Sequence, residues 1–206
     1  TGVYWKPVYK HLRIKWRASN EEAKDLTQGF FAHVLEKAIL DQYDAARASF
    51  RTFLRTCLDG YVGNERKAAA RQKRGGLALT MSLDFEDAEG EVRRHDPAVT
   101  VDPDETFSRE WMRSLFSLSV ERLRDELQST GREVQFQVFH RYDLCERGPD
   151  RKLTYDDLAH EFNLPVTQVT NFLAAARREF RRITLETLRD LTGSEEEFQE
   201  EASRLL

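Results

Sequence analysis

The sequence predicts an all-α protein in which two small helical domains are joined by an acidic flexible linker, the second domain ending in a helix-turn-helix. Apolar residues recur at every third or fourth position over most of the chain, which is the spacing of amphipathic helices. Only one short segment alternates like a β-strand, and no other segment could pair with it. Residues 77–104 interrupt the helical pattern with many acids, two prolines and a glycine, which is typical of a linker.

The 206 residues, of which 40% are hydrophobic, suffice for one large domain or two small ones. No apolar run approaches the roughly 18 residues that span a bilayer, and no basic-then-apolar start indicates a signal peptide. Two cysteines, Cys57 and Cys145, can form neither a disulfide framework nor a zinc site by themselves. We therefore expect a cytoplasmic protein with reduced thiols and no membrane contact. Because the chain opens at Thr1 without a Met, we also expect a fragment.

Residues 1–76 are predicted to form the first domain, with helices over 4–16, 21–39 and 45–61 and a basic helix that ends at residue 74. In the helix over 21–39 the apolar stripe runs from Ala23 to Val34 and includes Leu35. The stretch Ser19-Asn20-Glu21-Glu22 supplies a cap to this helix, with acids in the first turn.

The net charge of −4 hides an uneven distribution. Residues 1–76 carry 15 Lys and Arg against eight Asp and Glu, whereas residues 77–104 carry two against eight. The steepest basic run is residues 65–74, with five bases and one acid. Such a run is either a solvated helix face or a helix that binds a polyanion, and charge alone does not separate the two.

Residues 105–206 are predicted to form the second domain, opening with a long helix over 106–130. Residues 134–139 alternate like a strand, but they also fit a helix, and we expect a helix there. A short helix follows Gly148-Pro149, and a tight turn at Pro165 leads into a helix over 166–188. This spacing is typical of a helix-turn-helix, although an ordinary two-helix hairpin also matches it.

Four segments carry distinctive motifs: residues 25–31 read DLTQGFF, residues 50–54 FRTFL and residues 71–76 RQKRGG, and residues 154–178 hold the two helices described above. Together they resemble bacterial RNA polymerase sigma factors of the extracytoplasmic-function type. Residues 25–31 are similar to the D-L-x-Q-x-x-F signature of sigma region two. Residues 50–54 (FRTFL) and 71–76 (RQKRGG) resemble the stretches that follow it. Residues 154–178 are similar to region four, the helix-turn-helix of the family. The resemblance covers nearly the whole chain, in the family's order and spacing.

The resemblance implies a protein that binds core RNA polymerase and directs promoter-specific transcription initiation. In the family, the D-L-x-Q helix docks on the beta-prime clamp, which here points to Asp25 and Gln28, three residues apart on one helix face. The same two residues could also be ordinary surface polar groups. The family's further partners are the beta flap of the polymerase, promoter DNA and, for some members, an anti-sigma factor. Gly29 stands where the family usually has an acid, and Gly60 where it often has Asn.

The resemblance assigns the reading of the melted minus-ten element to the first domain. It places Tyr61 and Asn64 in a loop between two helices, where a flipped base would be held. The alternative for Tyr61 is a core aromatic. The basic residues that would contact phosphates on this side are Arg66, Lys67, Arg71, Lys73 and Arg74.

The minus-thirty-five element is duplex, and the family reads it with the start of the second helix of the helix-turn-helix. Val169 is expected to face inward there, which leaves polar neighbours for base edges and phosphates. These neighbours are Thr167, Gln168, Thr170 and Asn171. Arg177 and Arg178, with Arg181 and Arg182 further on, would grip the backbone, unless they form a solvated face paired with Glu179 and Glu186.

Enzymatic activity is not expected. The five histidines are scattered without ligand spacing, and no nucleophile, metal-site or phosphate-loop motif occurs. We therefore predict no catalytic residue, no metal and no cofactor. The alternative function is a helix-turn-helix transcriptional regulator that does not bind polymerase core, and binding to core polymerase separates the two.

Overall fold

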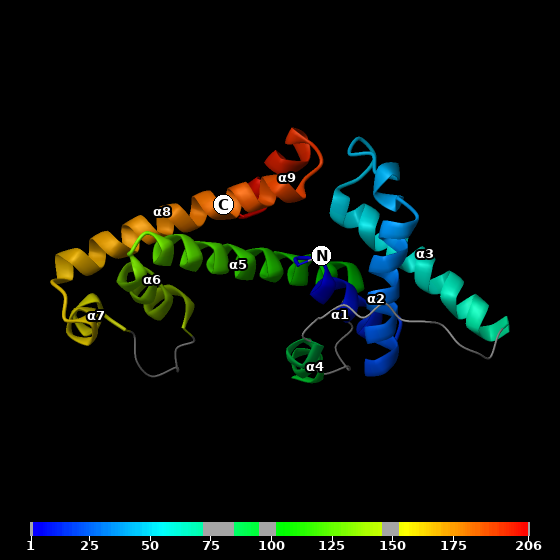
Figure 1. Ribbon diagram of the computed structural model, residues 1–206, viewed down its shortest axis with the longest axis horizontal. Helices are drawn as coiled ribbons and strands as arrows, with labels where there is room; N and C mark the ends of the chain where they lie inside the picture. Colours follow the sequence, from blue (N-terminus) through cyan, green and yellow to red (C-terminus); the bar gives the residue numbers. More distant parts are fainter. Residues whose placement is uncertain (1, 72–84, 95–101, 146–152, 206) are drawn as a thin grey trace. The chain divides into compact units, whose positions relative to one another are not determined.

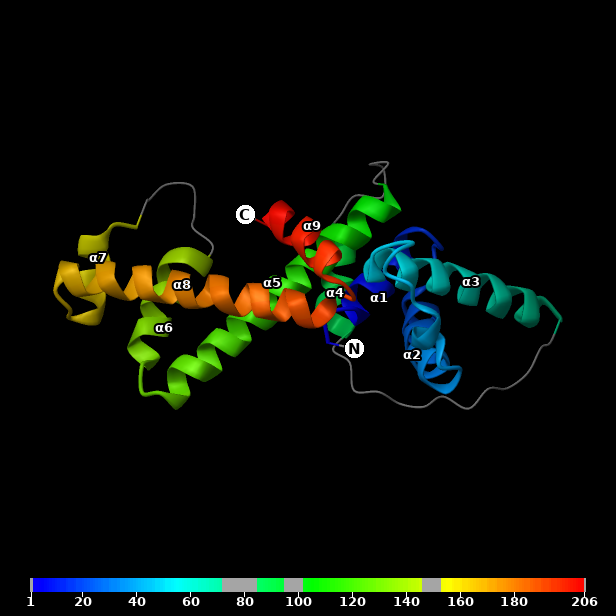
Figure 2. The same ribbon diagram turned by 90° about the horizontal axis from the view of Figure 1, so that it is seen from above.

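The computed structural model describes residues 2–71, 85–94, 102–145 and 153–205 of the chain. Within these ranges every regular element is a helix and no residue belongs to a β-strand, so the expected all-α fold is confirmed there (Figures 1 and 2). No helix in the same ranges combines the length and the apolar character that crossing a membrane requires. Cys57 and Cys145 are both free thiols.

The chain divides into two compact units. The first comprises Thr1–Ser114 together with Leu191–Leu206, and the second comprises Leu115–Asp190. These limits differ from those of the domains expected from the sequence, because segments beyond residue 76 pack on the N-terminal helices. The assignment of separate functions to residues 1–76 and 105–206 stays a prediction.

The first unit is built on helices α1 (Trp5–Ile14), α2 (Asn20–Glu36) and α3 (Phe50–Arg71), with the short 3₁₀ helix η1 (Ile39–Gln42) after α2. Their apolar faces form a core whose fully buried members include Val8, Leu12, Ala23, Phe30, Leu58 and Val62. The predicted N-cap of α2 is present, because Ser19 Oγ accepts the backbone N–H of Glu22 at 3.2 Å.

Helix α3 is continuous from Phe50 to Arg71, so Tyr61 and Asn64 lie within a helix. The expected loop at these two residues is therefore wrong. Leu54, Leu58 and Val62 are buried at a spacing of four residues, and this apolar stripe carries the helix past Gly60 without a break.

Helix α4 (Phe85–Arg94) lies inside the segment expected to be a flexible linker, and that expectation is wrong for these residues. Phe85 packs edge-on against Trp5, with ring centroids 5.5 Å apart. The buried carboxylate of Glu89 accepts hydrogen bonds from Tyr9 Oη at 2.5 Å and from Arg13 Nη2 at 2.8 Å. These contacts fix α4 on α1. Linker residues 77–84 and 95–101 lie outside the described residues.

Helix α9 (Glu195–Leu205) also belongs to the first unit, although it is at the end of the chain. Glu197 is buried and accepts the Phe50 backbone N–H at 2.7 Å, which supplies a cap to the start of α3. It also accepts the Tyr43 hydroxyl at 2.7 Å. Glu201, buried as well, pairs with Arg51 through two hydrogen bonds of 2.8 and 3.2 Å.

The second unit contains the later part of α5 (Pro103–Ser129), α6 (Glu133–Phe139), the π-helical turn η2 (His140–Leu144), α7 (Tyr155–Phe162) and most of α8 (Val166–Leu191). The helix expected over 134–139 is confirmed as α6. Helix α8 crosses α5 (Figure 2), and Arg122 Nη1 of α5 donates to Thr187 Oγ1 of α8 at 2.9 Å. The core between these helices includes Leu123, Leu127, Val138, Leu158, Val169 and Leu173.

Candidate DNA-binding and polymerase-binding surfaces

Helix α7 has defined signals at both ends. Thr154 Oγ1 accepts the N–H of Asp157 at 3.1 Å, while the Asp157 carboxylate accepts the N–H of Thr154 at 2.9 Å, which is a complete capping box. At the other end Asn163 takes a left-handed conformation, with φ of 52°. Only Asn163, Leu164 and Pro165 separate α7 from α8, so the expected short turn is present.

The first turns of α8 have an apolar inner face and a polar outer face. Val169 is fully buried, as expected, and Leu173 follows it inward. Thr167, Thr170 and Asn171 are exposed, whereas Gln168 is only partly exposed. No charged residue occurs between Val166 and Ala176, so this outer face offers only neutral hydroxyl and amide groups.

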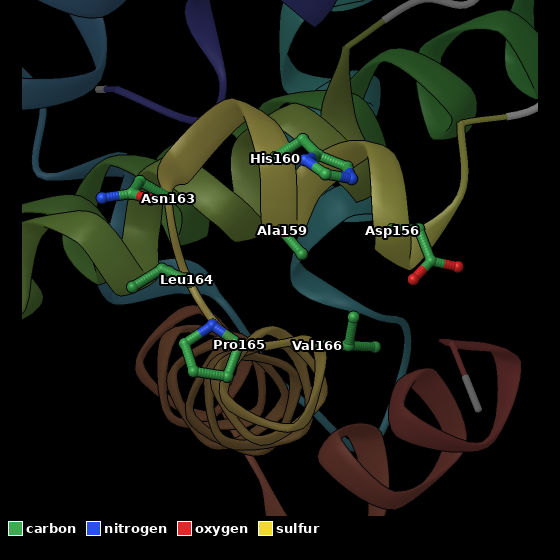
Figure 3. Close-up of a pocket in the computed structure, with 7 residues that line it drawn as sticks. All are labelled: Asp156, Ala159, His160, Asn163, Leu164, Pro165 and Val166. Carbon is green, nitrogen blue, oxygen red and sulfur yellow. The ribbon is translucent and has the colours of Figure 1, made fainter.

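A surface hollow of about 490 Å³ lies between α7 and the start of α8 (Figure 3). Asp156 and His160 of α7 supply its only ionisable side chains, and Pro165 and Val166 form its apolar wall. In the described part of the chain no three His, Cys, Asp or Glu side chains gather as metal ligands would. The hollow thus lies beside the exposed start of α8, with a lining that mixes polar and apolar side chains.

Arg177 is exposed on α8, but its guanidinium is engaged by side chains of the second unit. Its guanidinium donates to both carboxylate oxygens of Asp143, with Nε–Oδ2 and Nη2–Oδ1 distances of 2.9 Å each. It also lies over the ring of Tyr142, 5.5 Å from the centroid. The hydrogen bond from Arg177 to Asp143 raises the pKa of the guanidinium further above its already high value. The side chain expected to meet phosphate is thus occupied within the chain.

The other arginines of α8 divide into paired and unpaired side chains. Arg182 pairs with three carboxylates, those of Glu126 at 2.7 Å, Glu186 at 2.8 Å and Glu179 at 2.9 Å. This matches the alternative of a paired basic face. Arg178 and Arg181 are exposed, and no ion pair joins them to any residue that the structure describes. These two cations are free to meet a polyanion.

The described part of the basic run around α3 is partly engaged. Arg66 donates to the backbone oxygen of Trp16 at 2.8 Å and to Glu22 at 3.1 Å, and its guanidinium lies 5.2 Å from the Trp16 ring centroid. Lys67 and Asn64 are exposed on α3. Arg71 is the last residue of α3, whereas Lys73 and Arg74 lie outside the described residues.

Tyr61 lies on α3, and its side chain packs against α2. Its ring centroid is 5.7 Å from that of Phe30 and 5.2 Å from that of His33. Burial, with a smaller effect of the nearby Glu65 carboxylate, raises the pKa of Tyr61 to about 12. A Cβ atom at Gly29 would overlap the Tyr61 hydroxyl, so the glycine makes room for this ring. The ring thus packs against α2, as the core-aromatic alternative has it, although Tyr61 itself is only half-buried.

Asp25 and Gln28 both lie on α2, where Asp25 is exposed and Gln28 is partly exposed. Leu35 follows Gln28 by seven residues, about two helical turns, on the same side of α2. Leu35 is 70% exposed, so its expected place in the buried stripe is wrong. The helical pattern assigned Leu35 to the core, but its large apolar side chain lies at the surface in line with Gln28. The exposed face of α2 thus combines an acid, an amide and an apolar group.

No protein-family model, no curated protein and no solved structure matches this chain. The resemblance to sigma factors therefore stays a hypothesis that depends on the motifs themselves.

Proposed function

We propose that the chain is a sigma factor, which binds core RNA polymerase and directs transcription initiation at specific promoters. The observation that carries the proposal is the neutral polar face at the start of α8, formed by Thr167, Thr170 and Asn171. Amide and hydroxyl groups free of competing carboxylates suit the reading of base edges in the major groove, where Asn pairs well with adenine. Arg178 follows this face along α8, is exposed and forms no ion pair with any described residue. It supplies a phosphate contact.

The exposed face of α2 supports the polymerase-binding half of the proposal. Asp25 offers a charge to a basic partner helix, Gln28 a hydrogen-bonding amide and Leu35 an apolar contact. Interfaces commonly place an apolar centre beside polar groups of this kind. We assign this face to the beta-prime clamp. The minus-ten element is assigned to the basic side of the first unit, through Asn64, Lys67 and the residues that follow α3.

Binding to core polymerase is the deciding experiment. The purified chain should bind core enzyme in a pull-down, and Asp25→Ala combined with Gln28→Ala should weaken binding at least tenfold while leaving helical circular dichroism unchanged. The matched control is Glu195→Ala combined with Gln199→Ala. These two residues are an exposed acid and an exposed amide on α9, and Gln199 Nε2 donates a hydrogen bond to Glu195 Oε1 at 2.8 Å. If the α2 double variant binds core as well as the control does, the docking face is wrong.

One observation favours the second candidate, a helix-turn-helix regulator that does not bind core. Arg66 and Tyr61, both expected at the minus-ten element, are engaged by the chain's own Trp16 and Phe30. Duplex binding by the chain without any retention by core polymerase would establish this candidate and refute the sigma factor.

A further inference from the structure

The turn η2 places Asp143 and Tyr142 in an unusual backbone. The Cys145 N–H donates to the His140 oxygen at 3.0 Å, five residues back, which is the π-helical bond. Such a turn holds one more residue than an α-helical turn and changes the direction in which its side chains project. Single π-helical turns occur often at functional sites, which makes the contacts of this one informative.

Both side chains of the turn meet Arg177 on α8. The two parallel hydrogen bonds to Asp143 match the planar fork of a guanidinium to both oxygens of a carboxylate. The ring of Tyr142 contacts the guanidinium face. Arg177 is therefore held at its edge and at its face, and its rotation is restricted.

The same turn also contacts the start of α7. The ring centroids of Tyr142 and Tyr155 are 5.1 Å apart, and Tyr155 is the first residue of α7. One π-helical turn thus joins the beginning of α7 to the middle of α8. These are the two helices whose mutual orientation sets how Asn171 and Thr167 are presented.

We propose that Asp143 and Arg177 form a clasp that orients α8 for DNA reading, so that Arg177 is a positioning residue and not a phosphate contact. The inference rests on the proposed DNA-reading function and deepens it. The phosphate contact falls instead to Arg178, whose side chain is exposed and carries no ion pair in the described structure.

The Asp143→Asn variant separates the two roles by the direction of its effect. A clasp predicts that the 206-residue variant binds its preferred duplex about tenfold more weakly, with little change in its affinity for a scrambled duplex. A phosphate-binding Arg177 predicts the reverse, since losing the competing carboxylate would strengthen binding to both duplexes and steepen the salt dependence. The probes are a duplex enriched from a random pool by the wild-type chain and its scrambled counterpart, titrated by anisotropy at several salt concentrations.

Arg177→Ala and the double variant complete the cycle. The clasp predicts that Arg177→Ala leaves the slope of log affinity against log salt unchanged, and that the double variant binds no worse than either single one. Arg178→Ala is the matched control and should lower that slope by about one for both duplexes. Circular dichroism and thermal unfolding confirm that each variant is folded.

Two results overturn the proposal in distinguishable ways. A wild-type chain that enriches no duplex at all refutes the DNA-reading function, and the positioning role with it. The second result requires that the wild-type chain does enrich a duplex. If Arg177→Ala then loses affinity equally for both duplexes and lowers the salt slope by about one, the clasp alone is refuted.

Discussion

Gly29 has no side chain, and this allows α2 and α3 to pack closely at its position. A Cβ atom at this position would overlap the hydroxyl of Tyr61, which packs from α3 onto Phe30 and His33 of α2. A glycine inside a helix costs about 1 kcal/mol relative to alanine, so its presence needs a compensating contact. The Tyr61 ring supplies that contact. The departure from the sigma-factor pattern at this position thus has a packing reason.

We predict that Gly29→Ala lowers the free energy of unfolding by about 1 kcal/mol, because overpacking costs about 1–3 kcal/mol and outweighs the gain in helix propensity. In a Tyr61→Phe background the overlapping hydroxyl is gone, and the same change should become neutral or stabilising. Gly63→Ala is the control, since a Cβ there meets open space and should stabilise α3. Urea unfolding measures all four variants. Equal destabilisation by Gly29→Ala in both backgrounds would contradict the Tyr61 contact.

Asp59 joins α3 to α1 and to the residues that follow it. Its carboxylate accepts hydrogen bonds from Lys15 at 2.8 Å, from Trp16 Nε1 at 2.8 Å and from the buried His11 at 3.0 Å. Partial burial acts to raise the pKa of Asp59, but the three donors outweigh it and hold the pKa below its ordinary value. The carboxylate is therefore more stable as an anion in the folded chain than in the unfolded one.

A lowered carboxyl pKa stabilises the fold at pH values above the unfolded pKa of about 4 and loses this effect as the pH falls through the folded value. We predict that Asp59→Asn costs about 2 kcal/mol at pH 7, since hydrogen bonds to a charged group are lost. The deficit should shrink as the pH falls below about 4. Urea unfolding of both chains from pH 7 to pH 3 tests this. A deficit that is constant with pH would mean that Asp59 acts only through its shape.

At the scale of elements, the helices with a long apolar stripe were predictable and the short acidic one was not. The stripes from Ala23 to Val34 and from Val169 to Leu188 predict α2 and α8 directly. Helix α4 has only 10 residues, and its buried apolar residues are Phe85 and Ala88. Its attachment depends on Glu89 reaching Arg13, 76 positions earlier. No local pattern can indicate a partner at that distance, so the segment resembled a linker.

We predict that Glu89→Gln releases α4 from α1. An amide keeps one acceptor oxygen but cannot form the charged, two-pronged contact with Arg13, which should cost about 1–3 kcal/mol. Amide hydrogen exchange across 85–94 should become at least tenfold faster. Glu121→Gln on the exposed side of α5 is the control and should change nothing there. Unchanged protection in Glu89→Gln would show that Phe85 and Ala88 suffice to hold α4.

At the scale of the whole molecule, the two ends of the chain belong to one unit. Helix α9 carries five glutamates within residues 195–201, a composition that is typical of a solvated helix face. Yet Glu197 and Glu201 are buried, and their partners Phe50 and Arg51 lie 147 and 150 positions earlier. Gly193 lets the chain enter α9 beside Tyr43, where a Cβ atom would overlap the ring. Local sequence patterns cannot predict contacts between residues this far apart in the chain.

We predict that truncation after Leu191 destabilises the first unit and spares the second. Removing α9 uncaps α3, leaves Arg51 without Glu201 and exposes the apolar surface that Phe198 covers, which together should cost about 3 kcal/mol or more. All three tryptophans, Trp5, Trp16 and Trp111, lie in the first unit, so their fluorescence reports on that unit alone. The fluorescence midpoint in urea should therefore fall, while circular dichroism retains a later transition.

The carboxylates can be tested without deleting the helix. Glu197→Gln with Glu201→Gln should lower the fluorescence midpoint in the same direction as the truncation, whereas the exposed pair Glu195→Gln with Glu200→Gln should not. The Glu197 carboxylate accepts the Tyr43 hydroxyl and the backbone N–H groups of Phe50 and Gly193. The Glu201 carboxylate pairs with the Arg51 guanidinium. Neutralisation removes the charge assistance from these hydrogen bonds. If both double variants unfold at the same midpoint as the wild type, α9 is held by Phe198 and Ala202 alone, and its acids contribute nothing to joining the ends of the chain.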